Sequence, residues 1–309
     1  AGGLVWSTTF TRAGTELRLA GGEDARLIDL QGRPVRAFRP HGAVVGVAFS
    51  PDGRFVATAG GDGAVKLWDV AAGRSVRRFE GRHSGGVNDV AFSRDGRRLL
   101  TAGDDGTARL WNVDDAAEVR AFAGHTDRVT HAEFSPDGTQ IVTASADKTA
   151  RLWNTADGRL VRSFAGHRWG VNWAEFSPDG GRIVTAAADN EARVWNVADG
   201  AMSLTLSGHT APVACVCYSP DGARIVTGGA DAGVKLWDAA TGKEVLALKG
   251  HTGPISAVRF TVDGRRILTA SADGTAIVWP AVAWSSGGED DVTPRRARGN
   301  PEAEASGSP

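Results

Sequence analysis

Residues 124–164 read GHTDRVTHAEFSPDGTQIVTASADKTARLWNTADGRLVRSF and contain four short, largely apolar runs. The runs cover residues 129–134, 140–145, 149–154 and 160–164. Between the first two lies Ser-Pro-Asp-Gly, in which proline presets φ and glycine supplies a positive φ, so a tight turn is predicted. Short runs joined by hairpin-length turns predict one four-stranded antiparallel sheet. No stretch of the chain shows a sustained 3.6-residue apolar period, so no helix is expected.

The same pattern recurs along the 309 residues with a period of about 42. A more divergent unit at the start places Ile28 where later units have tryptophan. One such sheet cannot bury both of its faces, whereas radial stacking of several copies can. The sequence therefore predicts an all-β fold, a seven-bladed β-propeller of four-stranded antiparallel sheets. The tryptophans that set the period are Trp68, Trp111, Trp153, Trp195, Trp237 and Trp279.

Two dipeptides recur at fixed places within the units. A Gly-His pair precedes the first run, as at Gly124-His125, and the third run ends in Trp-Asp or Trp-Asn, as at Trp153-Asn154. Looser versions of the first pair occur at Pro40-His41 and Arg82-His83, and the last unit ends in Trp279-Pro280. On these residues the chain resembles the WD-repeat propeller family over roughly residues 4–281.

The resemblance implies a hydrogen-bonded network within each blade, joining His125, Thr143, Asp147 and Trp153 in the unit quoted above. A buried indole N–H requires an acceptor, and a buried carboxylate requires several donors. A catalytic triad is the alternative interpretation, but an active site occurs once and these residues recur. The structural network is expected to comprise His41, Thr58, Asp62, Trp68, His83, Thr101, Asp105, Trp111, His125, Thr143, Asp147, Trp153, His167, Thr185, Asp189, Trp195, His209, Thr227, Asp231, Trp237, His251, Thr269, Asp273 and Trp279.

Function is then expected among the residues that do not repeat. In the family that the chain resembles, partners usually contact the loops leading into each first strand and the mouth of the central channel. Exposed tryptophan and arginine are enriched at interface hot spots. Packing remains an alternative for Trp169 and Trp173, and a solvated position for His131. The candidate partner-binding residues are Trp6, Asn88, Asp89, Arg128, His131, Arg168, Trp169 and Trp173.

The leading functional hypothesis is a non-catalytic protein–protein interaction scaffold that serves as a regulatory module of a larger, bacterial, cytoplasmic protein. Only five of the 35 basic residues are lysine, which is typical of a GC-rich genome. A channel-mouth sensor of a peptide or small ligand is the first alternative and an enzyme the second. The non-repeated His131, Glu133, Glu175, Cys215 and Cys217 lack metal-ligand or triad spacing, so no catalytic residue, metal or cofactor is expected.

The composition argues against a nucleic acid or a membrane as the partner, so a protein or peptide is expected. The formal net charge is -1, whereas a nucleic-acid partner calls for a basic stripe. No apolar run approaches the roughly 20 residues that span a bilayer, so no membrane is expected. Two cysteines two residues apart on one strand suit a disulfide poorly, which favours a reducing compartment.

The propeller is expected over residues 1–284 and a disordered tail over residues 285–309, where charge, glycine and proline leave almost nothing apolar. The units supply six good fourth strands, so the last blade lacks its outer strand. Residues 281–285 are one candidate for it, and a strand upstream of Ala1, in an attached domain, is the other. The upstream strand is preferred because the usual spacing would place the strand at Gly287-Gly288, which are poor strand residues.

Overall fold

The computed structural model describes residues 7–10, 16–21, 24–29, 34–38, 44–79, 83–280 and 295–298, and every regular element among them is a β-strand. The strands form seven four-stranded antiparallel sheets, each built from strands that are consecutive in the chain. The first three sheets comprise β1 (Ser7–Phe10), β2 (Glu16–Gly21), β3 (Asp24–Asp29) and β4 (Pro34–Phe38); β5 (Val44–Phe49), β6 (Phe55–Gly60), β7 (Val65–Asp69) and β8 (Arg74–Phe79); and β9 (Val87–Phe92), β10 (Arg98–Gly103), β11 (Thr107–Asn112) and β12 (Glu118–Ala123).

The remaining four sheets continue the same order. They comprise β13 (Val129–Phe134), β14 (Gln140–Ser145), β15 (Thr149–Asn154) and β16 (Leu160–Ala165); β17 (Val171–Phe176), β18 (Arg182–Ala187), β19 (Glu191–Asn196) and β20 (Met202–Ser207); β21 (Val213–Tyr218), β22 (Arg224–Gly229), β23 (Val234–Asp238) and β24 (Glu244–Leu248); and β25 (Ile255–Phe260), β26 (Arg266–Ser271), β27 (Thr275–Pro280) and β28 (Arg295–Arg298).

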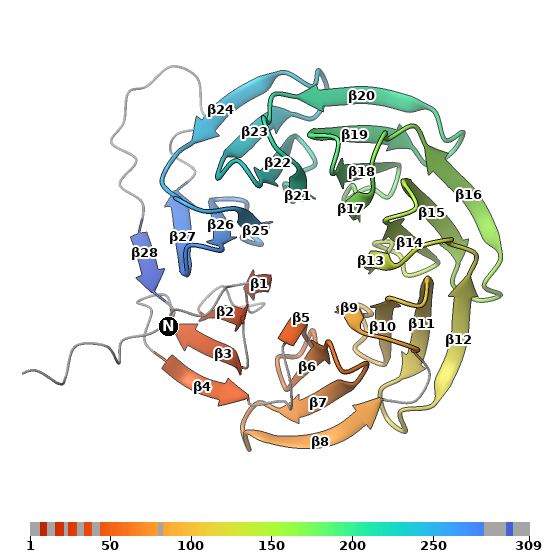
Figure 1. The fold of residues 1–309 in the computed structure, drawn as a ribbon. Helices are drawn as coiled ribbons and strands as arrows, with labels where there is room; N and C mark the ends of the chain where they lie inside the picture. The colour runs from red at the N-terminus through yellow and green to blue at the C-terminus, as the bar shows by residue number, and fades with distance from the viewer. Residues whose placement is uncertain are drawn as a thin grey trace, which may run out of the picture.

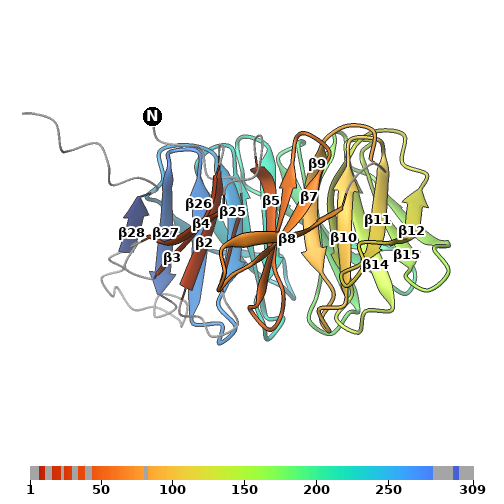
Figure 2. The same cartoon turned by 90° about the horizontal axis from the view of Figure 1, so that it is seen from below.

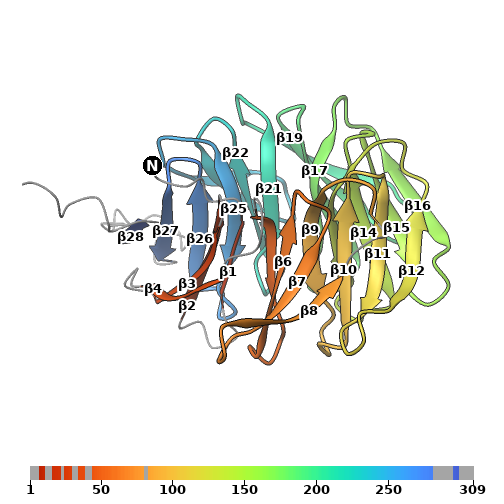
Figure 3. The same cartoon turned by 60° about the horizontal axis from the view of Figure 1, so that its bottom comes forward.

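The sheets stand radially around a common axis, with the first strand of each innermost and the fourth outermost (Figure 1). Strand β1 contacts both β5 and β25, so the first sheet adjoins the last and closes the ring. Seen from the side, the strands run along the height of the ring and the turns form its two ends (Figures 2 and 3). The prediction of an all-β propeller of four-stranded antiparallel sheets is confirmed.

The hydrophobic core lies between neighbouring sheets. The second strand of the β13–β16 sheet is buried at five of its six positions, whereas the fourth strand is mostly exposed. One core cluster joins Leu100 and Leu110 of one sheet with Val129, Ile141 and Trp153 of the next. Each sheet therefore buries its faces against its neighbours, as expected for a stack in which a single copy is not stable.

Arginines on two of the outer strands, β12 and β16, connect their sheets to the next. Arg120 donates from Nη1 to the Asp157 carbonyl at 2.9 Å and from Nη2 to the Ala156 carbonyl at 2.7 Å. Arg162 makes the equivalent two bonds, both at 2.8 Å, to Asp199 and Ala198. These charge-assisted bonds hold the turn between the third and fourth strands of the following sheet.

The outer strand of the last sheet differs from both alternatives considered above. It is β28, which pairs antiparallel with β27 from Thr275↔Arg298 to Val278↔Arg295. Neither residues 281–285 nor an upstream strand occupies that place, and the expected disorder is wrong for residues 295–298. Strand pairing uses backbone groups alone, so a charged segment can satisfy the free edge of β27 without an apolar pattern. Residues 281–294 and 299–309, which include the rest of the predicted tail, lie outside the described residues.

Candidate functional site

The recurring polar side chains meet inside the sheets that carry them, near the loop that leads into the first strand. In the β13–β16 sheet, His125 Nδ1 lies 2.7 Å from Asp147 Oδ2 and Nε2 lies 2.7 Å from Thr143 Oγ1. Trp153 Nε1 donates to the same threonine oxygen at 2.9 Å. With the carboxylate ionised, the proton sits on His125 Nδ1, and the threonine hydroxyl donates to Nε2.

The same geometry recurs through the described ring. Trp68 donates to Thr58 at 2.9 Å in the second sheet, where His41 lies outside the described residues. The full set of contacts occurs in five sheets, in the groups His83–Thr101–Asp105–Trp111, His125–Thr143–Asp147–Trp153, His167–Thr185–Asp189–Trp195, His209–Thr227–Asp231–Trp237 and His251–Thr269–Asp273–Trp279.

Burial favours the neutral imidazole in His83, His125, His167 and His209. Desolvation lowers the pKa of His125 below its ordinary value, and the hydrogen bond to Asp147 only partly offsets this. Burial would raise the pKa of Asp105, but hydrogen bonds from Thr107 and His83 outweigh it and hold the pKa at about 2. As the pH falls, histidines of the unfolded chain take up protons near their ordinary pKa of 6.5, whereas the buried histidines take them up only at lower pH. Protonation therefore favours the unfolded chain, and the free energy of unfolding decreases as the pH falls below 6.5.

The candidate partner-binding residues fall into two groups, and the first is exposed at the rim formed by the loops that enter the first strands. Arg128, Arg168 and Trp169 are exposed there, with Trp169 61% accessible. Lys148, in the turn between β14 and β15, places Nζ 5.6 Å from the centroid of the Trp169 ring. We call Arg128, Lys148, Arg168 and Trp169 the rim cluster. Trp6, the last rim candidate, lies outside the described residues.

The rim cluster is electropositive. Among the described residues, no carboxylate lies within ion-pair distance of Arg128, Lys148 or Arg168. The carboxylate nearest in sequence, Asp127, accepts from the Arg128 backbone N–H at 2.7 Å. Lys148 was not among the residues selected from the sequence, although its basic side chain is unusual at that position of the repeat. The equivalent turn positions in the other units are Gly63, Gly106, Asn190, Ala232 and Gly274, so only this unit places a basic residue there.

The second group lies on the innermost strands and braces one sheet against the next. Asn88 Nδ2 donates to the Val129 carbonyl at 2.9 Å, and Asp89 Oδ2 accepts from the Ala132 N–H at 3.3 Å. The inner edge of a first strand has no strand partner, so its backbone groups require other partners. Burial raises the pKa of Asp89 to about 7. Asn88 and Asp89 therefore act within the ring, in contrast to the rim surface predicted from the sequence.

Equivalent braces continue around the ring. Thr130 Oγ1 and Asn172 Nδ2 each donate at 2.8 Å to the carbonyl of the next first strand, at Val171 and Val213. Two glutamates provide the matching acceptors: Glu133 accepts from the Phe176 N–H at 3.2 Å, and Glu175 accepts from the Tyr218 N–H at 3.1 Å. These non-repeated side chains thus have a structural use.

His131 and Trp173 pack against each other between sheets. Their ring centroids are 3.8 Å apart with an interplanar angle of 31°, and the Arg259 guanidinium lies 4.8 Å from the Trp173 centroid. His131 is only 3% exposed, so its interpretation as a solvated strand residue is wrong. Burial lowers the pKa of His131 well below its ordinary value, so the ring is neutral. Trp173 therefore packs between sheets, which is the alternative considered for it in the sequence.

A cavity of about 270 Å³ lies beside the innermost strands, at the end where they leave the rim. We call it the inner-strand cavity and define it by Glu133, Glu175, Cys217, Tyr218 and Arg259, which line it with neighbouring turn residues. Arg259 Nη1 donates to Glu175 Oε2 at 2.7 Å. Arg259 was missed from the sequence. The equivalent positions on five other first strands are Ala48, Ala91, Glu133, Glu175 and Cys217, so the single basic residue among them was the signal.

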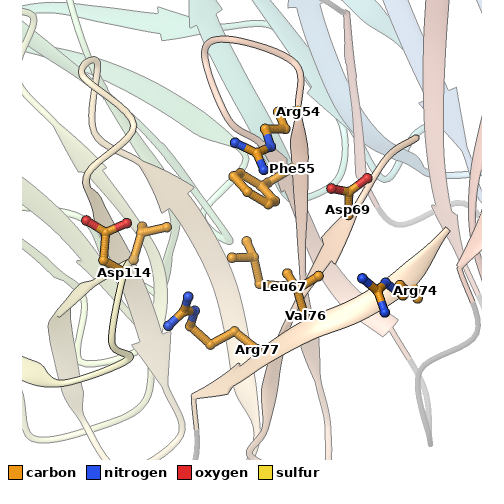
Figure 4. Close-up of a pocket in the computed structure, with 9 residues that line it drawn as sticks. Arg54, Phe55, Leu67, Asp69, Arg74, Val76, Arg77 and Asp114 are labelled. Carbon is orange, nitrogen blue, oxygen red and sulfur yellow. The ribbon is translucent and has the colours of Figure 1, made fainter. Parts of the chain in front are cut away.

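A second cavity, of about 240 Å³, lies between the sheets of β5–β8 and β9–β12 and contains none of the candidate residues. Figure 4 shows Arg54 beside Phe55, with Asp69 and Arg74 on one side and Arg77 and Asp114 on the other. The charges are spread around the wall, and they do not converge on one point. This arrangement offers no nucleophile–base pair.

The two cysteines are free and buried. Burial raises the pKa of the Cys215 thiol to about 12, which leaves it protonated and a poor nucleophile at neutral pH. Within the described ranges, no group of three or more histidine, cysteine, aspartate and glutamate side chains could hold a metal ion. No helix in that part of the chain is long and apolar enough to span a membrane.

Comparison with known families gives one match. The family model described as WD domain, G-beta repeat matches six segments, residues 32–69, 73–112, 117–154, 158–196, 200–238 and 242–280. Each segment begins with the outer strand of one sheet and ends with the third strand of the next, so β1 to β3 lie outside the matches. A comparison with curated proteins found no match.

Proposed function

Because the chain belongs to the WD-repeat family, whose propellers are typically protein-interaction scaffolds, we propose that it binds a protein partner through the rim cluster. The observation that carries this proposal is the exposure of Trp169, a large apolar side chain at the rim with the Lys148 ammonium beside its ring. A tryptophan that is exposed in the free protein is available to a partner, and such residues often dominate binding energy.

The same proposal covers the larger setting of the chain. It acts as a non-catalytic regulatory module of a bacterial, cytoplasmic multidomain protein, with the sheet of β1–β4 as a seventh blade. Contacts of β1 with β5 and β25 support the seventh blade. The free thiols of Cys215 and Cys217 support a reducing compartment. The arginine-rich composition supports the bacterial origin.

Trp169→Ala is expected to weaken partner binding by about 2 kcal/mol or more, as for a hot-spot residue. The partner would be captured from lysate of the source cells on immobilised protein, identified by mass spectrometry and purified. Isothermal titration calorimetry would then compare its affinity for the wild-type chain and the variant.

The matched control is Val262→Ala. Val262 is 68% exposed and lies in the turn after β25, at the end of the ring opposite the rim. The control should bind the partner as tightly as the wild-type chain. Equal affinity of the Trp169→Ala and wild-type chains for every captured protein would contradict the proposal.

A further inference from the structure

The rim cluster occupies one sector of the ring. Arg128 and Arg168 lie in the loops that enter β13 and β17, and Lys148 lies in the turn between β14 and β15. Three other units have an entering loop of the same length, and none places a charged or aromatic residue at the positions of Arg128, Arg168 and Trp169. Their residues there are Gly86, Pro212 and Pro254; Ser84, Thr210 and Thr252; and Gly85, Ala211 and Gly253.

Backbone contacts hold the segments of the rim cluster together. The Arg128 carbonyl accepts from the Ala146 N–H at 3.1 Å. Gly170 packs on the same turn, where a Cβ added to it would lie 3.1 Å from Ala146 Cα. Lys148 follows in that turn, with its Nζ 5.6 Å from the centroid of the Trp169 ring. The two loops and the turn therefore form one continuous surface.

The backbone of Lys148 gives an independent observation. Its φ is 74°, in the left-handed region that disfavours residues with a side chain. The five equivalent turns also have a positive φ there, and three of them use glycine, at Gly63, Gly106 and Gly274. Strained backbone of this kind is concentrated at functional sites. A lysine at this place indicates that its ammonium group has a use.

Most of the positive charge of the rim cluster is uncompensated. The three cationic side chains are exposed and form no ion pair within the part of the chain that the structure describes. Asp127 is the exposed carboxylate beside them, and it accepts from the Arg128 backbone N–H. The side chains of Asp147 and Asp189 are only 4% and 3% exposed and pair with histidines inside their sheets. A negatively charged ligand therefore complements this surface.

We propose that the rim cluster binds an acidic peptide segment of its partner. Glutamate or aspartate carboxylates of that segment meet Arg128, Lys148 and Arg168, and an apolar side chain between them packs on Trp169. This inference rests on the function proposed above and adds the chemistry of the partner. A peptide is favoured over a nucleic acid because three cations on two adjacent sheets form no extended basic stripe, and the formal net charge of the chain is -1.

The test titrates the full chain with the peptide acetyl-Glu-Glu-Leu-Glu-Glu-amide and follows the 1H–15N NMR signals of the indoles. We expect a saturable shift of the Trp169 signal. The neutral peptide acetyl-Gln-Gln-Leu-Gln-Gln-amide should bind about tenfold more weakly or worse, because it lacks the charges that complement the rim. Raising the NaCl concentration from about 50 to about 300 mM should weaken binding of the acidic peptide about threefold or more, because salt screens exposed charges.

Lys148→Gly separates binding from folding. Glycine adopts the left-handed conformation without steric cost, so the melting temperature should not fall below that of the wild-type chain. The affinity for the acidic peptide should nevertheless fall about fivefold or more, because one of three charges is lost. The matched control is Lys243→Gln, which removes an exposed lysine from the turn between β23 and β24, at the opposite end of the ring. It should bind the peptide as the wild-type chain does.

Three results would overturn the proposal: no saturable shift of the Trp169 signal, equal binding of the acidic and neutral peptides, or tighter binding of oligothymidylate than of the acidic peptide at this surface. A captured partner that loses affinity in Trp169→Ala but keeps it in Lys148→Gly and at high salt would also overturn the acidic chemistry, while leaving the rim as the binding surface. Failure of the rim function itself would appear instead as unchanged affinity of Trp169→Ala for every captured protein.

Discussion

Replacing Trp153 with alanine is expected to lower the free energy of unfolding by about 3–5 kcal/mol, the range for truncating a large buried aromatic side chain. Trp153 is 3% exposed and packs in the cluster between two sheets, with its ring centroid 6.0 Å from that of Phe122. The substitution leaves a cavity at that interface. It also removes the indole N–H that donates to Thr143 at 2.9 Å. Urea unfolding followed by circular dichroism measures the change.

Trp169→Ala is the matched control, because it makes the same chemical change at an exposed position. We expect it to alter the free energy of unfolding by no more than about 0.5 kcal/mol, as for a surface substitution away from special features. Equal losses of stability in the two variants would contradict the assignment of Trp153 to the architecture and of Trp169 to the surface.

Asp147→Ala is expected to destabilise the fold by about 1–3 kcal/mol or more, because it leaves several buried donors without an acceptor. The carboxylate accepts from His125 Nδ1 at 2.7 Å, from the Thr126 N–H at 3.2 Å, and from the Thr149 N–H and hydroxyl at 3.0 and 2.6 Å. It therefore connects the loop before the first strand to the turn before the third. The urea midpoint should fall relative to that of the wild-type chain.

Asp114→Ala is the control for this change, since Asp114 is exposed and its carboxylate accepts no hydrogen bond from the described residues. Its urea midpoint should match that of the wild-type chain. Hydrogen bonds hold the pKa of Asp147 below its ordinary value against the opposing effect of burial. The Asp147 contribution is thus present above about pH 4, and the difference between the Asp147→Ala and wild-type chains should shrink as the pH falls further. An unchanged midpoint in Asp147→Ala at neutral pH would show that the network does not support the fold.

The fold was largely predictable because its determinants repeat. The 42-residue spacing of Trp111, Trp153 and Trp195 reflects one sheet per unit, and the apolar runs coincide with the strands. Strand β28 could not be found in this way. Its pairing with β27 depends on backbone groups at a free edge, and residues 295–298 read Arg-Arg-Ala-Arg, with no apolar alternation.

The candidate site was less predictable, because its contacts join residues of different units. Asn88 was selected as an unusual residue, but its use depends on the Val129 carbonyl, which lies 41 residues later on the next sheet. Arg259 meets Glu175 across 84 residues, and no local pattern encodes that approach. A residue type that is unusual at its position in the repeat did mark residues with special contacts. It did not reveal that Asn88 holds two sheets together whereas Trp169 is exposed.

Hydrogen exchange of the indole N–H groups, followed by 1H–15N NMR after transfer to D2O, tests most directly whether the recurring tryptophans serve the architecture and Trp169 the surface. The six indoles that donate to a threonine hydroxyl, at Trp68, Trp111, Trp153, Trp195, Trp237 and Trp279, should exchange slowly, whereas that of Trp169 should exchange before the first spectrum. Rapid exchange of the six recurring indoles, or protection of Trp169 equal to theirs, would contradict this division.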